Sequence, residues 1–338
     1  MRKIILLTGG SGFVGRNIIP ILKGEGFEVR ALARSNQSMQ AVRNYGAIPV
    51  KGDLTDRASL DAAAKGCDIV IHAAAYMKFW GSKAPFYQIN VDGTKNMLHA
   101  AEKAGVQKFI GIGAASVING QEIYEKDETY IPPQLPKDYY SLTKALAEKE
   151  VVKANNENFQ TVILRPPAIW GPHNHSTQMM VDRVKAGSWV WIGGGQHRLS
   201  TIHVFNLAQA ILAAIDKGGN GEIYFVTDGE QHPIKELFGK MFQQYGVIAG
   251  DRSLSRSFAL TTAKVIQFIW NTFGLKSDPP IVPVMIHLMG TEFSVSDRKA
   301  RRELGYRNAI SIEEGMHTLT RIPEYPGRTQ GKYRSQTD

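Results

Sequence analysis

The sequence is poor in cysteine and has no hydrophobic run long enough to cross a membrane. Its one cysteine, Cys67, excludes an internal disulfide framework and provides no metal-site spacing, which favours a reducing compartment. A membrane-spanning helix needs about 20 apolar residues in succession, and no segment reaches that length. We expect no leader segment, because the first strand-like run begins at about Lys3. The sequence therefore predicts a cytoplasmic protein.

The chain also lacks internal repeats, low-complexity tracts and any basic stripe interleaved with aromatic residues. The last absence argues against nucleic acid as a partner. The net charge of +9 fits an anionic ligand or a membrane surface, although part of the excess falls in the tail between Arg321 and Arg334. With 338 residues, 43% of them hydrophobic, the chain can form one large domain or two ordinary ones.

The most informative segment present is a glycine-rich turn close to the start. It follows the apolar run Ile4–Leu7, which predicts a buried strand, and it leads into a segment with helical spacing. Gly9 would allow a tight turn, Gly12 the close approach of a pyrophosphate, and Gly15 tight packing of helix on strand. The helix N-terminus would offer N–H groups to the phosphates. We therefore predict dinucleotide contacts from Thr8, Gly9, Gly12, Phe13, Val14 and Gly15.

Strand-like and helix-like segments alternate through the first half of the chain. This alternation predicts an α/β fold of Rossmann type, with a doubly wound parallel sheet. We expect a cofactor domain over residues 1–166 with contributions from about 200–227, a smaller interwoven substrate-binding domain mainly over 167–325, and a flexible tail over 326–338. The strands are expected at about Lys3–Thr8, Glu28–Ala33, Ile48–Lys51, Ile69–Ala73, Phe109–Gly113 and Thr161–Arg165, and the clearest helices over Ala84–Ala104 and Tyr139–Ala154.

The end of the second predicted strand indicates which dinucleotide is bound. An acidic residue there would hold the ribose of NAD, whereas a nearby arginine accommodates the 2′-phosphate of NADP. Ala33 stands at the acidic position, and Arg34 and Ser35 follow it. A guanidinium binds phosphate well, and a hydroxyl adds a hydrogen bond. We predict NADP, with NAD as the alternative if Arg34 is only a solvated surface residue.

Asp53 and Leu54 follow the third predicted strand on the ligand side of the sheet. The carboxylate of Asp53 could accept a hydrogen bond from the amino group of adenine, so we include both residues in the cofactor site. The alternative is a helix N-cap at Asp53 or Asp56, and for Asp56 this is the favoured interpretation.

Tyr140 and Lys144 share one face of the helix predicted to follow the fifth strand. This pair suits the reduction of a carbonyl group. A phenol with an ordinary pKa of about 10 exchanges protons poorly at neutral pH. A neighbouring ammonium and an oxidised nicotinamide would both favour the phenolate and bring the pKa into a useful range. The alternative is a surface tyrosine beside a solvated lysine.

Taken together, these motifs resemble the extended short-chain dehydrogenases/reductases, the superfamily of the NAD-dependent epimerases and dehydratases. Within it, the chain looks like the 3β-hydroxysteroid dehydrogenase branch, including related reductases of β-keto acids, and the likeness extends to about Arg321. The motifs that carry it are Thr8–Gly15, Asp53, His72–Ala75, Asn90–Thr94, Tyr140 with Lys144, Arg165–Pro167, Trp170–Pro172, Thr201–Ala208 and Lys299–Tyr306.

The resemblance implies roles for several further residues. Tyr140 would be the proton donor or acceptor, and Lys144 would hold the nicotinamide ribose. Pro167, with Pro166, would line the nicotinamide pocket. The backbone of Ala73, Ala74 and Ala75 would pass along the cofactor, which makes the neighbouring His72 structural, and Asn90 would fix the bend of the central helix or relay water.

The pattern breaks after the fifth strand, where the family carries a catalytic serine or threonine. Ala114 stands at that position, and Ser116 follows two residues later. In a regular strand Ser116 would lie roughly 6–7 Å further along, whereas a loop that turns back would bring it into reach. Ser116 is therefore a candidate catalytic hydroxyl. If it does not take this role, the enzyme is slower or uses another hydrogen-bond donor.

Several functions remain open at this point. Dehydratases of the superfamily place an Asp-Glu pair where this chain has Ala115 and Ser116. The sequence therefore argues against a dehydratase. A sugar-nucleotide epimerase is one alternative, but Arg198 stands one residue away from the position of the diphosphate-binding arginine of epimerases, which weakens it. A cofactor sensor or scaffold that has lost catalysis is the other alternative. The leading hypothesis is an NADP-dependent oxidoreductase that interconverts a hydroxyl and a ketone on a bulky apolar, sterol-like or β-keto acid-like substrate.

The expected partners follow from the same residues. Tyr76, Phe79, Trp80, Trp170 and the apolar region Phe258–Met289 are expected to face a small-molecule substrate, although most of that region is expected in the core. Lys264 and Lys276 flank a stretch that fits peripheral contact with a membrane surface. A homodimer through the helices Ala84–Ala104 and Tyr139–Ala154 is a further expectation from the resemblance.

Overall fold

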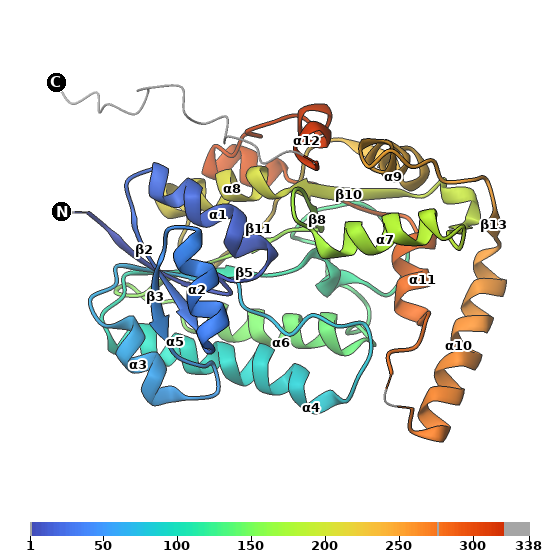
Figure 1. The fold of residues 1–338 in the computed structure, drawn as a ribbon. Coiled ribbons are helices and arrows are strands. Elements are labelled where there is room, and N and C mark those ends of the chain that lie inside the picture. Colours follow the sequence, from blue (N-terminus) through green and yellow to red (C-terminus); the bar gives the residue numbers. More distant parts are fainter. Residues whose placement is uncertain (1, 276, 321–338) are drawn as a thin grey trace.

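The computed structural model describes residues 2–275 and 277–320, and a seven-stranded parallel sheet forms its centre (Figure 1). The strand order is β11-β7-β5-β4-β1-β2-β3, so the predicted doubly wound α/β fold is confirmed. The predicted tail over 326–338 lies outside the described residues. The strands are β1 (Ile4–Thr8), β2 (Glu28–Ala33), β3 (Ile48–Lys51), β4 (Ile69–His72), β5 (Lys108–Ile112), β7 (Gln160–Arg165) and β11 (Glu222–Phe225).

Helices cover both faces of this sheet because its strands are apolar on both sides. In β1, Ile5 and Leu7 face one layer and Leu6 faces the other, as the alternation of a strand requires. The first layer contains α1 (Phe13–Gly24), α2 (Asn36–Asn44) and α8 (Val204–Lys217), and the second contains α3 (Arg57–Ala64), α5 (Gly93–Lys103) and α6 (Tyr139–Lys153).

A smaller mixed sheet lies beyond the carboxyl ends of the parallel strands. Its order is β12-β10-β14-β6, with β8 paired to β10, and only the β10–β12 pair is antiparallel. Its elements and their neighbours are β6 (Ile123–Lys126), β8 (Ala168–Trp170), α7 (His175–Lys185), β9 (Trp191–Ile192), β10 (Arg198–His203), β12 (Gln231–Pro233), α9 (Ile234–Gln244), β13 (Ser253–Leu254), α10 (Arg256–Phe273), α11 (Pro283–Gly290), β14 (Phe293–Val295) and α12 (Ile312–Thr318). The division of the chain into domains stays a proposal.

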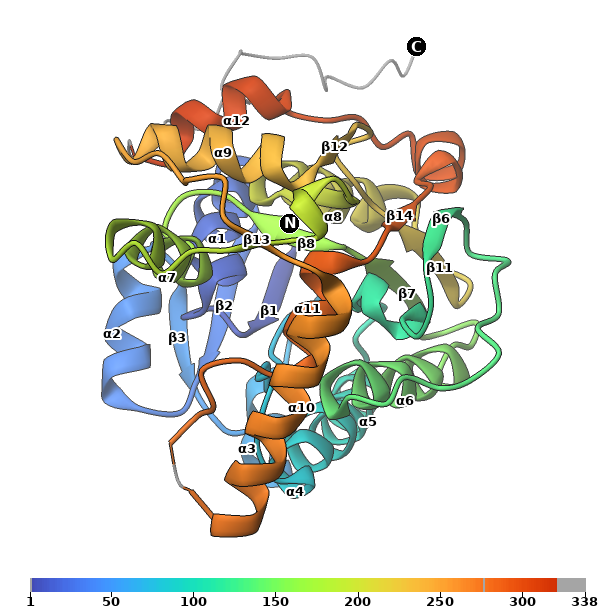
Figure 2. The ribbon, with the colours of Figure 1, turned by 90° about the vertical axis from the view of Figure 1, so that its right-hand side faces the viewer.

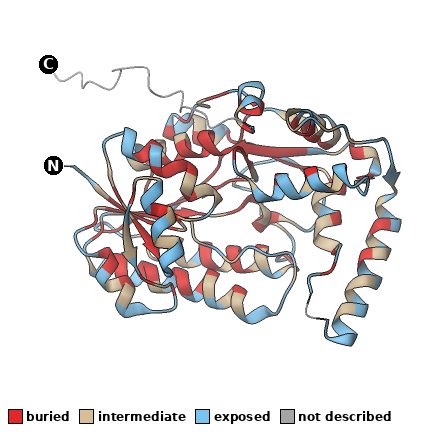
Figure 3. Ribbon diagram, viewed as in Figure 1, coloured by how far each residue is buried: buried red, intermediate tan, exposed pale blue. Residues whose placement is uncertain are grey.

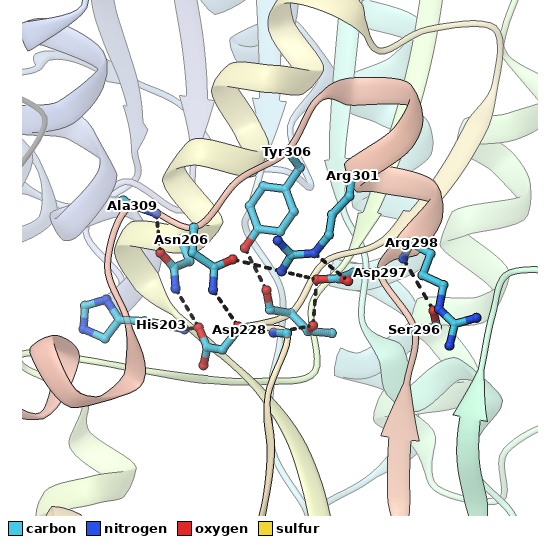
Figure 4. A network of polar contacts seen from close by, with 12 residues as sticks. His203, Asn206, Asp228, Ser296, Asp297, Arg298, Arg301, Tyr306 and Ala309 are labelled. Atoms are coloured by element: carbon cyan, nitrogen blue, oxygen red, sulfur yellow. Dashed lines mark hydrogen bonds and ion pairs between the residues drawn. The ribbon is translucent and has the colours of Figure 1, made fainter.

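The chain passes between the two sheets more than once. After β10 in the smaller sheet, α8 packs against α1 and β11 pairs with β7 in the large sheet. One buried carboxylate, that of Asp228, joins these parts (Figure 4). It accepts hydrogen bonds from Trp170 Nε1 at 2.7 Å, the His203 N–H at 2.7 Å and Asn206 Nδ2 at 2.8 Å.

The helix expected over Ala84–Ala104 is interrupted. It consists of α4 (Lys83–Phe86), the π-helix η1 (Tyr87–Asp92) and α5. An apolar spacing does not reveal a π-turn, because the turn is held from outside the helix. The Asn90 side chain accepts a hydrogen bond from the Tyr76 N–H at 2.7 Å and donates one to the Tyr76 carbonyl at 3.2 Å. Asn90 therefore ties the bend of the helix to the segment after β4.

No helix among residues 2–275 and 277–320 is long and apolar enough to span a bilayer. Three short helical turns complete the element list: η2 (Ala115–Ile118), η3 (Gly193–Gly195) and η4 (Ala300–Leu304).

Candidate active site

The glycine turn joins β1 to α1 with the geometry that its spacing predicts. Gly9 has a φ of +74°, which favours glycine, and a Cβ there would lie 2.8 Å from the Ala74 nitrogen. A Cβ on Gly15 would lie 2.4 Å from the Cα of Gly10, so this position admits no side chain. A Cβ on Gly12 would meet only the Gly9 oxygen, at 3.3 Å. Gly12 thus has open space on the side where a ligand would approach.

The start of α1 is suited to an anion. Its N-cap, Gly12, makes no side-chain hydrogen bond to the helix, and the first turn contains no acidic residue. The N–H groups and the positive end of the helix dipole therefore face the opening beside the turn. An open pocket of ≈ 520 Å³ adjoins it, lined by Ser11, Gly12, Phe13, Arg16, His173, Asn174, His175, Gln178, Tyr245 and Leu319.

Sequence reasoning missed the role of Gly10. A Cβ at this position would lie 2.9 Å from Ala31 Cβ and 3.2 Å from Val42 Cγ1. Gly10 therefore lets the turn pack on β2 and α2. The adjacent glycine pair was the available signal, but only the folded packing shows why both are needed.

A chain of buried polar side chains connects the turn to β4. Thr8 Oγ1 lies 2.9 Å from His72 Nδ1 and accepts a hydrogen bond from the Ala74 N–H at 3.1 Å. His72 Nε2 lies 3.0 Å from Thr94 Oγ1. Burial, with a smaller effect of Lys144, lowers the pKa of His72 to about 3, so the imidazole is neutral. These contacts place the segment 73–75 against the turn, in line with the structural role proposed for His72.

The residues expected to bind the adenosine end of the cofactor lie together, but they differ in how free their side chains are to bind it. Arg34 is exposed and lies near Asp53. Hydrogen bonds from Thr55 hold the pKa of Asp53 below its usual range, and the charge of Arg34 adds a smaller effect in the same direction. The hydroxyl of Ser35 is the N-cap of α2 and accepts from the Ser38 N–H at 3.1 Å. Ser35 is therefore less free to bind phosphate through its hydroxyl than the sequence suggested.

The two residues after β3 have local structural roles. Asp53 Oδ1 accepts hydrogen bonds from both the N–H and the hydroxyl of Thr55, at 2.9 and 2.8 Å. The Leu54 side chain lies in the core against Gly93, which leaves only its backbone for a cofactor. Asp56 is the N-cap of α3, as predicted.

Tyr140 and Lys144 lie in the first turns of α6, which begins at the N-cap Asp138. Lys144 is buried, and its Nζ donates to the Ile112 carbonyl, at the end of β5, at 2.6 Å. Burial raises the pKa of Tyr140 to about 12, and the Asp138 carboxylate adds to this effect. The direction is opposite to the one expected from the sequence, because burial disfavours the phenolate and the Asp138 carboxylate repels it.

The ammonium of Lys144 is also affected by its surroundings. Burial lowers the pKa of Lys144 to about 8, while the carboxylate of Glu148, one turn along α6, acts in the opposite direction. Glu148 in turn forms a buried ion pair with Arg165 at the end of β7, with Arg165 Nε 2.8 Å from Glu148 Oε2. Arg165 belongs to a motif noted in the sequence, but that motif does not indicate Glu148 as its partner.

Ser116 lies in a helical turn, η2, that packs against the helix bearing Tyr140. The strand β5 stops at Ile112, and the chain then turns into η2, which packs against α6. The Ser116 Oγ is buried without a hydrogen-bond partner among the described residues. An orphaned buried hydroxyl is costly and therefore points to a missing partner. Ala114, at the position of the usual hydroxyl, is buried.

The apolar residues expected to face a substrate divide into two groups. Trp170 was predicted wrongly: it is only 3% exposed, because its ring packs against His203 and its Nε1 donates to Asp228. Tyr76 and Phe79 belong to the loop after β4, and the region Phe258–Met289 forms the hairpin of α10 and α11. Pro167 follows β7 and is partly buried.

A second polar pocket contains none of the predicted site residues. It has a volume of ≈ 540 Å³ and lies around the network of Figure 4, where Arg301 is paired with Asp297 at 2.9 Å. Arg198, the residue considered for an epimerase, begins β10 with its backbone N–H bonded to Glu292.

The order of these features is that of a known family. The chain matches the 3-beta hydroxysteroid dehydrogenase/isomerase family over residues 6–256. The chain belongs to this family. Relatives within it align over nearly the full length of both chains, which confirms the resemblance found in the motifs and the place of the family among the extended short-chain dehydrogenases/reductases.

Three relatives illustrate the range of this family. A 4-hydroxy-2-methyl-3-oxo-4-farnesyl-3,4-dihydroquinoline-1-oxide ketoreductase of Stigmatella aurantiaca is 33% identical, covering 93% of this chain and 94% of its own. A decarboxylating sterol-4-alpha-carboxylate 3-dehydrogenase of Dictyostelium discoideum is 34% identical, covering 94% of this chain and 100% of its own. A 2-alkyl-3-oxoalkanoate reductase of Stenotrophomonas maltophilia is 30% identical over 93% and 98%.

The fold extends to more distant proteins. A crystal structure of a UDP-glucose 4-epimerase from Thermotoga maritima aligns with a TM-score of 0.73 at 21% identity, over 94% of this chain and 97% of that one. This likeness shows the fold alone. As a member of the 3-beta hydroxysteroid dehydrogenase/isomerase family, the protein is an NAD(P)-dependent oxidoreductase that acts on CH–OH groups.

Proposed function

We propose that the protein is an NADP-dependent reductase of a bulky apolar ketone, with Tyr140 as its proton donor. The observation that carries the proposal is the arrangement at the end of β5. Lys144 is anchored there on the Ile112 carbonyl, and η2, with the orphaned hydroxyl of Ser116, packs against the same helix that bears Tyr140. A donor, a buried cation and a second hydroxyl thus belong to adjoining elements.

The residues present fit a bound NADP. The uncapped start of α1 and the space beside Gly12 would accept the pyrophosphate, and the exposed guanidinium of Arg34 would bind the 2′-phosphate. Thr8, Phe13, Val14 and the segment 73–75 would line its path. When bound, the nicotinamide supplies or accepts a hydride. NAD is the weaker alternative, because no acidic residue ends β2.

The protonation states favour the direction of reduction. With a pKa of about 12, the Tyr140 phenol holds its proton at neutral pH and can donate it to a developing alkoxide. Lys144, with a pKa of about 8, is mainly protonated at neutral pH and would hold a ribose hydroxyl of the cofactor. Ser116 would donate the second hydrogen bond to the substrate oxygen, in place of the hydroxyl missing at Ala114.

The proposed substrate class rests on chemistry that the relatives share. The names of these three relatives indicate a ketone or a 3-hydroxyl on a farnesylated quinoline, a sterol and an alkylated 3-oxo acid. Each couples one redox-active oxygen to a large apolar group. The apolar loop after β4 and the hairpin of α10 and α11 would receive such a group in this chain.

Oxidation of NADPH against a panel of apolar ketones tests the proposal. Tyr140→Phe should remove turnover by roughly a hundredfold or more while NADPH still binds. Tyr139→Phe is the matched control, because Tyr139 is the preceding residue of α6 and is exposed. Binding of NADPH without turnover of any ketone, unchanged by Tyr140→Phe, would instead support the sensor or scaffold. Epimerisation of a sugar nucleotide would support the other alternative.

Two lesser predictions about partners and place belong to the same proposal. We expect a homodimer through α5 and α6, which pack side by side on one face of the large sheet. Light scattering on the purified protein would measure it. The cytoplasmic location inferred from the single cysteine stays a prediction.

A further inference from the structure

The helix α10 is apolar on two opposite sides. Its inner side, with Ala259 and Ala263, packs on Ile192 and Ile286 in a small cluster separate from the main cores. Its outer side carries large apolar residues at helical spacing, which a helix at a protein surface does not need for folding. These residues, with their exposed fractions, are Phe258 (60%), Val265 (53%), Phe268 (69%), Ile269 (37%) and Phe273 (73%).

The position of α10 leaves this outer side uncovered. Figures 1 and 2 show α10 and α11 as a hairpin at one end of the molecule, with α11 between α10 and the rest of the protein. Figure 3 shows α10 as mostly exposed or intermediate along its length. Burial and two nearby cations lower the pKa of His287 on α11, whereas Asp138 raises it. Asp138 is the N-cap of α6, so the hairpin lies beside the start of the proposed catalytic helix.

The apolar surface continues beyond the hairpin. Lys78 and Asp278 form an ion pair at 3.8 Å that joins the loop after β4 to the connection between α10 and α11. The residues on either side of Lys78, Met77 and Phe79, are exposed. We define the apolar rim as the outer side of α10 together with Leu275, Met77 and Phe79.

The charged residues within the α10 segment itself have one sign. Between Asp251 and Asp278 the sequence contains no acidic residue and four basic ones, Arg252, Arg256, Lys264 and Lys276. Lys264 is exposed on α10 itself. The acidic residue that ends this stretch, Asp278, is paired with Lys78 at 3.8 Å, and Glu122, from the segment before β6, is paired with Arg256 at 3.5 Å. The apolar rim is therefore bordered mainly by cations.

We propose that the apolar rim docks on the surface of an anionic lipid bilayer. An interfacial helix inserts its apolar side to the boundary of headgroups and acyl chains, and flanking cations bind the lipid phosphates. The outer side of α10 and its cationic surroundings meet both requirements. A second copy of this chain fits less well, because joining two identical faces would bring the same cations together. This proposal does not depend on the proposed function.

Sedimentation with vesicles tests the proposal. The full-length protein should bind vesicles of phosphatidylcholine mixed with phosphatidylglycerol more strongly than vesicles of phosphatidylcholine alone, and high salt should weaken the binding. The double variant Val265→Glu with Phe268→Glu should bind the anionic vesicles roughly tenfold more weakly or worse. Ile131→Glu is the control, because Ile131 is 85% exposed and lies far from α10 in sequence.

A second variant separates charge from insertion. Lys264→Glu leaves the apolar residues in place and should weaken binding severalfold, with unchanged thermal unfolding and circular dichroism. The proposal would be overturned by equal vesicle binding of the wild type and the double variant, or by no preference for anionic lipid. It would equally be overturned by a dimer in solution that the double variant converts to monomer, since a second copy would then cover the rim.

Discussion

The Asn90 amide donates a hydrogen bond to Thr143 Oγ1 at 3.0 Å and thereby joins the π-turn of the central helix to the catalytic helix α6. The Thr143 hydroxyl in turn donates to the carbonyls of Tyr139 and Tyr140, at 2.6 and 3.1 Å. Because Asn90 also holds both backbone groups of Tyr76, one side chain positions the loop after β4 and the turn that bears Tyr140.

We predict that Asn90→Ala lowers both stability and turnover. The Tyr76 N–H would lose its partner, which costs about 1–3 kcal/mol in the free energy of unfolding. The loss of the link to Thr143 should reduce kcat more than it raises KM for NADPH, because the turn that bears Tyr140 would shift while the proposed phosphate contacts at the glycine turn and at Arg34 stay in place. Thermal unfolding and steady-state kinetics measure the two effects. Thr143→Ser keeps the hydroxyl and should restore most of the turnover lost in Thr143→Val, and an equal loss in both would contradict this role.

Two glycines of the turn should respond differently to alanine. Gly15→Ala places a Cβ 2.4 Å from Gly10 Cα, so the free energy of unfolding should fall by about 3 kcal/mol. Gly12→Ala brings a Cβ to 3.3 Å from the Gly9 oxygen, a tight contact that a small shift relieves, so it should cost only about 1 kcal/mol, yet weaken NADP binding roughly tenfold or more. Gly24→Ala, where a Cβ meets nothing within 4 Å, is the control. Chemical denaturation measures the stability of each variant, and titration with NADP measures its binding. Normal NADP binding by Gly12→Ala would refute the proposed pyrophosphate site.

The activity should fall above about pH 8. The pKa of Lys144 is about 8, so raising the pH through that value removes the ammonium that would hold the cofactor. Tyr140, with a pKa of about 12, should remain protonated and add no limb below pH 10. A profile of kcat/KM from pH 6 to 10 measures this decline. Glu148→Gln should move the decline to lower pH, because the carboxylate supports the charged form of Lys144; a profile that stays flat to pH 10 would argue against the assignment.

Stability should fall as the pH decreases below 6.5. Burial lowers the pKa values of both His72 and His203 to about 3, whereas in the unfolded chain they are near 6.5. Between these values the unfolded chain binds protons that the folded chain does not, so each histidine lowers stability by about 1.4 kcal/mol per pH unit. Denaturation from pH 7 to 4 should show a slope reduced by about that amount in His72→Asn, and an unchanged slope would exclude His72 as a buried neutral group.

The parts predicted well from the sequence are those governed by local physics. The apolar strand, the glycine spacing and the helix after them lie within residues 4–24, and a single glycine geometry connects them. The pair Tyr140 and Lys144 was found in the same way, because one helical turn places them on one face.

What escaped prediction depends on contacts distant in sequence. Trp170 is buried because its partner Asp228 lies 58 residues away, and no local pattern marks that pairing. Strands of three residues, such as β8 and β14, have too little length for a periodicity. The pKa of Tyr140 moved upward because desolvation is a property of the folded surroundings, and the spacing to Lys144 says nothing about it.

The buried side chain of Asn206 depends on partners that are synthesised more than 100 residues later. Its Oδ1 accepts hydrogen bonds from the N–H groups of Ala309 and Ile310, at 2.7 and 3.1 Å, from within a helix that covers the large sheet. The two hydrogen bonds to Asn206 Oδ1 therefore form only after residues 309 and 310 have been synthesised. A chain that stops before residue 309 would therefore lack both donors, and its α8 would keep an amide oxygen that the complete fold buries and satisfies.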